Sequence, residues 1–390
     1  MQITDRAVED KTMPLFRLGF RPLFLFGTVY AGWAMVRWIL VLSGVLPWEY
    51  AVPVTAWHSH EMLFGFGMAI VVGFLTTAVQ NWTGHRGING TPLMGLFALW
   101  VVARITANFA PATLLQVLAD AGFMLVAIGV MARQVLLVRN YKNLVFVPVL
   151  SIFLVLHLAQ SWAMNHDVML ARALGFTTIW CFTLLISLLG ARVIPFFIER
   201  RLSDTLQRDS VPWIVLAQFP LFLLALCALF SAPELWVQIV AAMAFLIHAR
   251  RAFIWYRNGI WQEPLLWSLY LSYLCLPMAL ALLAVSGINQ YSPVMHLLSV
   301  GLIGGMIMAM MCRVSLGHTG RPLKSHPLAW VSMASILLAA VSRVVIPWFF
   351  PIWTVGAYHL AATLWLLSIV TFLMVYTRYF LQPRVDGQIG

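Results

Sequence analysis

Long apolar stretches separated by short polar connections run along the whole chain. Breaking this pattern at Gly, Pro and charged residues predicts twelve helices of roughly 20 to 28 residues, each able to cross an apolar layer about 30 Å thick. We therefore expect an all-α, polytopic transmembrane bundle that forms one integral-membrane domain over residues 1–390. The expected spans lie near 22–46, 57–80, 91–110, 112–139, 144–164, 168–195, 211–230, 233–254, 264–286, 292–316, 326–350 and 352–380.

Composition and charge sharpen this picture. The chain is 62% hydrophobic and only 9% charged, which excludes a water-soluble fold. Its net charge of +11 does not indicate nucleic acid, because the Lys and Arg residues fall in alternate connections. The connections at 47–56, 165–167 and 287–291 contain no basic residue. Since cytoplasmic loops collect basic residues, both termini are expected in the cytoplasm.

Two histidines at the same expected depth suggest a cofactor. His60 and His296 each lie a few residues inside spans that run inwards, about 5 Å below the outer boundary. Two neutral imidazoles at one level can hold a heme iron between them. No CxxCH motif occurs, so the predicted cofactor is heme b. Glycines after each histidine would let a flat macrocycle approach, or would serve ordinary helix packing: Gly65, Gly67, Gly73, Gly301, Gly304 and Gly305.

A deeper pair, His157 and His359, lies about 10 Å from the outer boundary. These residues are candidates for a second metal or heme; the alternative is hydrogen bonding to neighbouring carbonyls. His58 lies next to the face of His60, where it would stack at the surface or bind copper with His60 or His166.

Copper has a second candidate site. Met308, Met311 and Cys312 fall at i, i+3 and i+4, one soft helix face suited to Cu(I), although such a stripe also suits core packing. His318, in the segment LGHTGRP, is expected in a cytoplasmic loop, where it would order a helix end or contact a partner or redox donor.

Four arginines fall inside the outer halves of spans: Arg37, Arg104, Arg172 and Arg343. A buried arginine in lipid needs an anion. One reading pairs them with acids at similar depth, namely Glu49, Glu61, Asp120 or Asp167. The other places Arg343, with Arg104 or Arg37, on the propionates of the heme.

A weak internal repeat relates the two histidine-bearing spans. His60 is followed 23 residues later by Thr83-Gly84, and His296 is followed 23 residues later by Thr319-Gly320. A looser echo at His166 would make three four-helix units from the twelve helices.

Three stretches, FRLGFRPLF, WHSHEMLFGFGMAIVVGFLTTAVQNWTG and GMIMAMMCRVSLGHTGRP, resemble signature stretches of the NnrS family. The resemblance covers essentially the whole chain. It implies a bacterial inner-membrane protein associated with denitrification and nitric-oxide stress, similar to members described as containing heme and copper. His58, His60, His296 and His318 match motif positions of the family.

A more distant similarity is to the twelve-helix catalytic subunits of heme–copper oxidases and nitric-oxide reductases. His60, His296 and Arg343 fall where that architecture holds its low-spin heme. The sequence lacks a WxHPEVY-like segment in the sixth span and the histidine pair that follows it, so a binuclear copper–heme centre is not expected. This analogy concerns architecture only.

The resulting functional expectation is a heme b protein of the inner membrane that binds nitric oxide, or transfers electrons to lower it. An NO-consuming oxidoreductase would need an open iron position or the second metal. The expected partners are the lipid bilayer, nitric oxide and an electron donor, without nucleic acid. Two alternatives remain open: a secondary transporter of an anionic solute, and a heme or copper carrier for the assembly of other enzymes.

Overall fold

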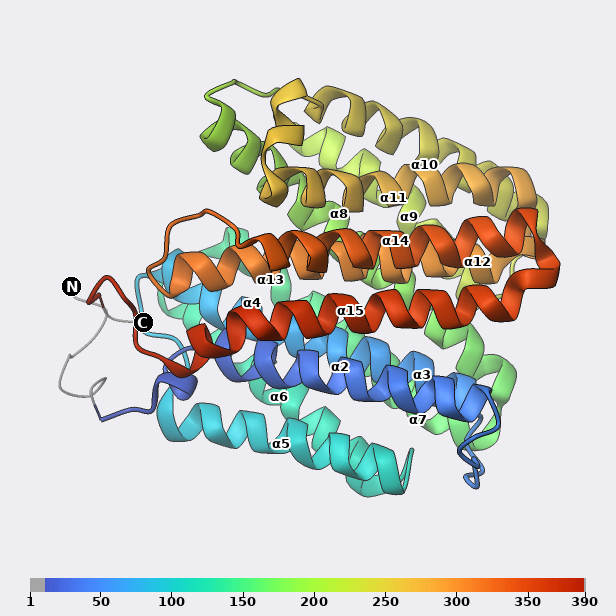
Figure 1. The fold of residues 1–390 in the computed structure, drawn as a ribbon, viewed down its shortest axis with the longest axis horizontal. Coiled ribbons are helices and arrows are strands. Elements are labelled where there is room, and N and C mark those ends of the chain that lie inside the picture. The colour runs from blue at the N-terminus through green and yellow to red at the C-terminus, as the bar shows by residue number, and fades with distance from the viewer. Residues whose placement is uncertain (1–10, 389–390) are drawn as a thin grey trace. The chain divides into compact units, whose positions relative to one another are not determined.

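A computed structural model describes residues 11–388, and these residues form helices and connecting turns only (Figure 1). Within this range, eleven helical runs are long and apolar enough to cross a membrane. The prediction of an all-α polytopic bundle is therefore confirmed. One of the eleven runs, Pro264–His318, is 55 residues long and contains a turn at Gly287–Gln290, where two spans were predicted.

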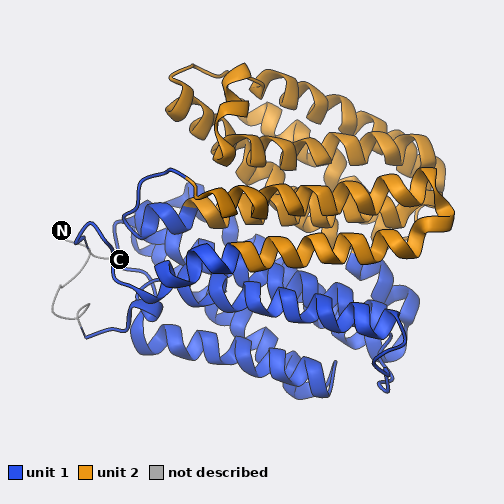
Figure 2. Ribbon diagram, viewed as in Figure 1, with its two compact units in different colours: residues 1–175, 314–324, 372–390 blue, residues 176–313, 325–371 orange. Residues whose placement is uncertain are grey.

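The chain forms two compact units, coloured separately in Figure 2. Unit 1 comprises residues 1–175, 314–324 and 372–390, and unit 2 comprises residues 176–313 and 325–371. The single domain and the three four-helix units expected from the sequence stay predictions. The ends of the chain, residues 1–10 and 389–390, lie outside the described residues, and the cytoplasmic location of both termini also stays a prediction.

The helices of unit 1 are α2 (Phe20–Leu42), α3 (Val54–His60), the π-helix η2 (Glu61–Gly67), α4 (Met68–Thr83), α5 (Gly90–Phe109), α6 (Leu114–Leu137) and α7 (Phe146–His166). Those of unit 2 are α9 (Val211–Leu229), α10 (Glu234–Trp255), α11 (Pro264–Ser286), α12 (Tyr291–His296), the π-helix η6 (Leu297–Gly304) and α14 (Pro327–Phe349). Three helices contribute residues to both units: α8 (Val168–Leu202), α13 (Gly305–His318) and α15 (Thr354–Leu381). Short 3₁₀ turns lie at Pro14–Phe16, Tyr141–Asn143, Asn258–Gln262, Gly287–Gln290 and Pro351–Trp353.

The run α3–η2–α4 is the central helix of unit 1. Helices α2, α5, α6 and α7 pack against parts of it. Over its most apolar stretch 83% of the residues are buried, whereas the other ten runs reach 28–56%. Polar side chains on this helix therefore face protein and must find their hydrogen-bond partners there.

The predicted repeat has a structural counterpart. Each copy begins with a short α-helix that ends at the histidine, His60 or His296. A π-helix of seven or eight residues follows, and then an α-helix. A left-handed glycine lies 24 residues after each histidine: Gly84 (φ 68°) and Gly320 (φ 73°). No π-helix follows His166, where α7 ends and α8 begins, so the proposed third copy of the repeat lacks this feature in the described chain.

Two of the glycines that follow the histidines, Gly73 and Gly301, lie at close helix–helix contacts. A Cβ on Gly73 would lie 3.0 Å from the Cβ of Leu23, and one on Gly301 would lie 2.7 Å from the Sγ of Cys275. Neighbouring helices thus already occupy the space in front of these glycines, which favours the packing interpretation over the approach of a macrocycle.

Arg21 fastens the N-terminal helix of unit 1 to its C-terminal segment. Its fully buried guanidinium donates hydrogen bonds to the backbone carbonyls of Tyr379, Phe380 and Gln382, at the end of α15. A cation at the C-terminal end of a helix also complements the helix dipole.

Candidate functional site

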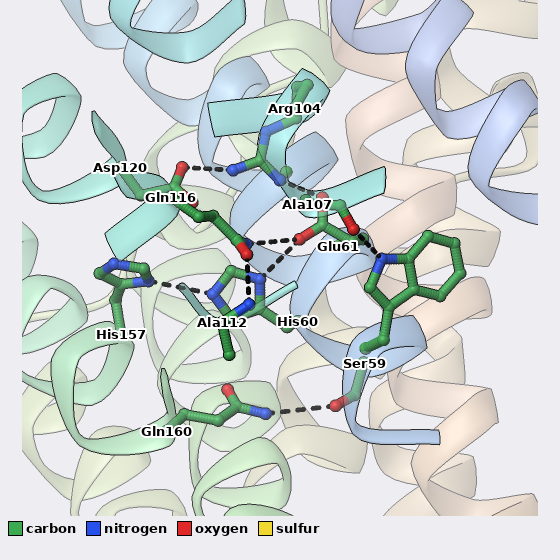
Figure 3. Close-up of polar contacts among 12 residues, drawn as sticks. Ser59, His60, Glu61, Arg104, Ala107, Ala112, Gln116, Asp120, His157 and Gln160 are labelled. Atoms are coloured by element: carbon green, nitrogen blue, oxygen red, sulfur yellow. Dashed lines mark hydrogen bonds and ion pairs between the residues drawn. The ribbon is translucent and has the colours of Figure 1, made fainter. Parts of the chain in front are cut away.

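His60 and Glu61 lie at the junction of α3 and η2, near the N-terminal end of the most buried helical run of unit 1. Both side chains are completely buried. Figure 3 shows the polar chain that they form with side chains from three other helices, α5, α6 and α7.

The carboxylate of Glu61 is surrounded by donors. Oε1 accepts hydrogen bonds from His60 Nδ1 at 2.8 Å and from Gln116 Nε2 at 3.2 Å. Oε2 accepts from the Tyr30 hydroxyl and from the guanidinium of Arg104. Four donors from four different side chains therefore satisfy the two oxygens of this buried carboxylate.

Arg104, on α5, bridges two carboxylates. One guanidinium nitrogen pairs with Glu61 and the other pairs with Asp120 on α6. These three side chains are almost fully excluded from solvent, with at most 4% of any of them exposed. The fixed charges of the cluster, two carboxylates and one guanidinium, therefore sum to −1.

His157, on α7, contacts His60 directly. The Nε2 of His60 and the Nδ1 of His157 are 3.0 Å apart. The other ring nitrogen of His157, Nε2, is the outer nitrogen of the pair and faces the Val117 carbonyl at 3.3 Å. Phe64 packs against both rings, 5.1 Å and 5.4 Å from their centroids. The sequence grouped these histidines with other partners and did not predict this contact.

Three of these side chains can share one small cation. His60, Asp120 and His157 each present a ligand atom, and the three atoms lie within 4.8 Å of one another. Asp120 uses Oδ1 for Arg104, while its buried Oδ2 has no hydrogen-bond partner.

The chain matches the family described as NnrS protein over residues 14–384, nearly its whole length. The chain belongs to the NnrS family. No curated protein matches the sequence. Membership of the NnrS family indicates a role in the response to nitric oxide, in a multi-pass membrane protein. The match includes both histidine-led repeats, and it bears out the resemblance seen in the sequence.

In this NnrS chain, His296 belongs to unit 2 and has different surroundings. It is half-buried, and its Nδ1 donates to the Ser292 carbonyl at 2.7 Å. Arg343 reaches the Ser292 hydroxyl at 3.4 Å and stacks on the ring of Tyr358 at 3.9 Å. Within residues 11–388, Arg343 makes no ion pair with a carboxylate.

The other arginines proposed as propionate anchors differ in their surroundings. Arg104 pairs with Glu61 and Asp120, as expected if the buried arginines pair with acids at similar depth. Arg37 donates to the backbone and side-chain oxygens of Asn108 and lies 5.1–5.6 Å from the rings of Trp48, Tyr50 and Trp57. Arg172 is exposed on α8. Of the three anchor candidates, Arg104 therefore has the least capacity for a further anion.

The remaining candidate ligands make packing contacts. His58 stacks on Trp38 with ring centroids 4.4 Å apart, one of the two outcomes expected for it. The Met308 thioether accepts a hydrogen bond from Ser332 and is buried together with Met311 and Cys312. Copper binding at either place stays a prediction.

Two further histidines complete the predicted set. His318 ends helix α13 instead of lying in a loop, because the helix continues two residues beyond the predicted end at 316, and its ring packs on Phe20. His359 lies half-buried on α15 in unit 2, where its pairing with a second metal or heme stays a prediction.

Several members of the buried polar clusters were not predicted from the sequence. Tyr30 and Gln116 were not among the candidate site residues, because a single neutral polar residue in an apolar run does not by itself indicate a functional site. His248 is also fully buried, in unit 2, between the Tyr273 hydroxyl at 2.8 Å and the Ala217 carbonyl at 3.1 Å.

Proposed function

We propose that the protein is a heme b-binding protein of the bacterial inner membrane that binds nitric oxide during nitrosative stress, or transfers electrons to lower it. The chain would cross the membrane twelve times, with both termini in the cytoplasm. The turn at Gly287–Gln290 supports twelve crossings, because α12 and η6 pack back against α11 after it.

The observation that carries this proposal is the histidine-led π-helix, present twice. π-Helices are rare, and they frequently lie at functional sites. Both runs begin directly after a histidine in a long apolar segment, where an ionisable side chain is a functional candidate. The repeat thus supports ligand roles for His60 and His296.

The residues around His296 fit a heme ligand and a propionate anchor. The bond from Nδ1 to the Ser292 carbonyl fixes the tautomer in which Nε2 carries the lone pair, and metal-bound histidines usually donate their other N–H in this way. Arg343 brings a cation to the same serine, without a carboxylate to neutralise it among residues 11–388. Such a cation suits a propionate.

For His60, heme ligation requires a local rearrangement. Two axial nitrogens on one iron are about 4 Å apart, given metal–nitrogen bonds of about 2 Å. His60 and His157 are 3.0 Å apart, so a macrocycle does not fit between these two rings. His60 would have to leave His157 to bind heme iron, and its axial role stays a prediction.

When bound, heme b supplies an iron that takes nitric oxide or passes electrons. His296 would hold it through an oriented nitrogen, and Arg343 would offer charge to the propionates. Nitric oxide is small and neutral, so it can reach a buried iron from the lipid without a polar channel. A position open to the gas is required for binding.

Absorption spectra of the detergent-purified protein test this proposal. We expect a Soret band near roughly 410–430 nm that moves on reduction with dithionite and on addition of nitric oxide. His296→Ala should abolish the band, and Arg343→Ala should weaken it, while His166→Ala, a substitution at an exposed histidine, should leave it unchanged.

Other results would favour the alternatives. A folded protein with no Soret band would refute heme binding and favour a secondary transporter, whereas sub-stoichiometric, easily lost heme would favour a carrier. Full heme content in His296→Ala would refute the assigned ligand. Full heme content in His60→Ala would separately remove His60 from the heme.

A further inference from the structure

We infer that unit 1 contains a metal site of its own, in which His60 Nε2, His157 Nδ1 and Asp120 Oδ2 bind one divalent first-row transition ion of the iron(II) or zinc class. This site goes beyond the proposed heme function and does not require heme to be present, but it uses His60, so the ion and the heme would compete for that side chain. All three ligands lie within one compact unit, on the central helix and the two helices α6 and α7.

The outer hydrogen bonds of the two imidazoles already have the pattern found around metal-bound histidines. The outer nitrogen of His60 faces the carboxylate of Glu61, and that of His157 faces the carbonyl of Val117. Both partners are acceptors, so both outer nitrogens carry hydrogens. A ligating histidine typically donates its second N–H to just such a carboxylate or backbone carbonyl.

The inner nitrogens, Nε2 of His60 and Nδ1 of His157, face each other 3.0 Å apart. A metal ion bound to both inner nitrogens uses neither of the outer hydrogen bonds. The fixed charge of −1 from Glu61, Asp120 and Arg104 favours a cation at this position.

Asp120 supplies the third ligand. Its side chain is 3% exposed, and Oδ2 is a buried acceptor with no hydrogen-bond partner. A buried unpaired carboxylate oxygen is costly, and coordination of a cation relieves that cost. Arg104 holds the other oxygen, and hydrogen bonds of this kind orient the carboxylates that bind metal ions.

The spacing of the histidines indicates the type of ion. Metal–nitrogen bonds of about 2.1 Å place two nitrogens about 3.0 Å apart at a 90° angle and about 3.4 Å apart at a tetrahedral angle. The observed 3.0 Å fits adjacent positions of a six-coordinate ion and needs a few tenths of an ångström of opening for a tetrahedral one. Two histidines and one carboxylate on one face form the triad that binds iron(II) in non-heme proteins.

Metal analysis of the full-length protein tests this inference. The protein, purified with a tag that contains no histidine, is incubated anaerobically with iron(II), zinc(II) or copper(I), freed of unbound ion, and analysed by mass spectrometry. We expect about one iron or zinc ion per chain. His157→Ala and Asp120→Asn should reduce the bound ion by at least tenfold, and Glu61→Gln should weaken affinity about 10–100-fold through its contact with His60.

His166→Ala is the matched control, because it removes an exposed histidine from the same helix, α7. Asp120→Asn keeps the shape of the side chain and an oxygen for Arg104, so it separates ligand loss from misfolding. The Soret band is recorded for every variant. Ion loss with an unchanged Soret band supports the inference, whether or not heme is present in the wild type.

Three results would overturn it. The first is a folded wild-type protein that retains no ion. The second is an ion that persists in both His157→Ala and Asp120→Asn at the level of His166→Ala. The third is retention of copper(I) alone, which would refute the assigned ion class.

Discussion

Replacing Gly65 by alanine tests whether the cluster around Glu61 is as tightly packed as the structure indicates. A Cβ at this position would lie 2.6 Å from a guanidinium nitrogen of Arg104 and 3.0 Å from a carboxylate oxygen of Glu61. Carbon atoms in ordinary contact are about 3.5 Å from their neighbours. The guanidinium would therefore have to move by about 0.9 Å, more than a hydrogen bond tolerates.

Either response of the protein is unfavourable. If Arg104 stays, the overpacking costs about 1–3 kcal/mol. If it moves, a charged hydrogen bond worth about 1.5–3 kcal/mol is lost. The higher helix propensity of alanine relative to glycine offsets about 0.5–1 kcal/mol of this cost. We expect Gly65→Ala to lower the free energy of unfolding by about 1–2 kcal/mol.

Gly95→Ala provides the matched control. Gly95 lies on α5 with nothing within 4 Å of its would-be Cβ, so alanine there should stabilise the protein by about 0.5–1 kcal/mol. Thermal unfolding in detergent, followed by the fluorescence of the chain's 17 tryptophans, compares the two variants. Equal stabilities for Gly65→Ala and Gly95→Ala would show that the space beside Gly65 is open and that the packing described for Arg104 is wrong.

Two further predictions concern the buried charges and the repeat. Arg104→Met leaves two buried carboxylates uncompensated and should cost about 3–5 kcal/mol in the same unfolding assay. Arg133→Met, at an exposed position of α6, is the control and should change stability by less than about 0.5 kcal/mol. Similar values for both variants would contradict the ion-pair assignment. Gly84→Ala and Gly320→Ala should each cost about 1–2 kcal/mol because both glycines have positive φ. Only Gly320→Ala should also speed proteolysis of the C-terminal tail, because its Cβ would lie 2.5 Å from the Asp386 carboxyl carbon. Equal cleavage of both variants would show that the tail does not pack against Gly320.

Much of the helical pattern could be predicted from the sequence, because each span is a long apolar run with clear end signals. The seventh span, expected at 211–230, is observed at Val211–Leu229. The eleventh, expected at 326–350, is observed at Pro327–Phe349, with proline at its first position.

The site was predicted less completely. His60, Glu61, Arg104, Asp120 and His157 were each named from the sequence, yet the contact between the two histidines was not expected. Counting residues from the helix ends gives the depth of a residue in the membrane, but it does not show in which direction around the helix axis the side chain points. The count was also shifted, because α3 begins at Val54 where the span was expected at 57.

The π-helix after His60 makes the register of this segment sensitive to insertions and deletions. Removing one residue from Glu61–Gly67 while the helices on either side keep their length would turn the preceding segment by about 100° around the helix axis. The imidazole of His60 would then point away from α7, although the hydrophobic character of the span would be unchanged. A change invisible to hydropathy would thus dismantle the buried cluster.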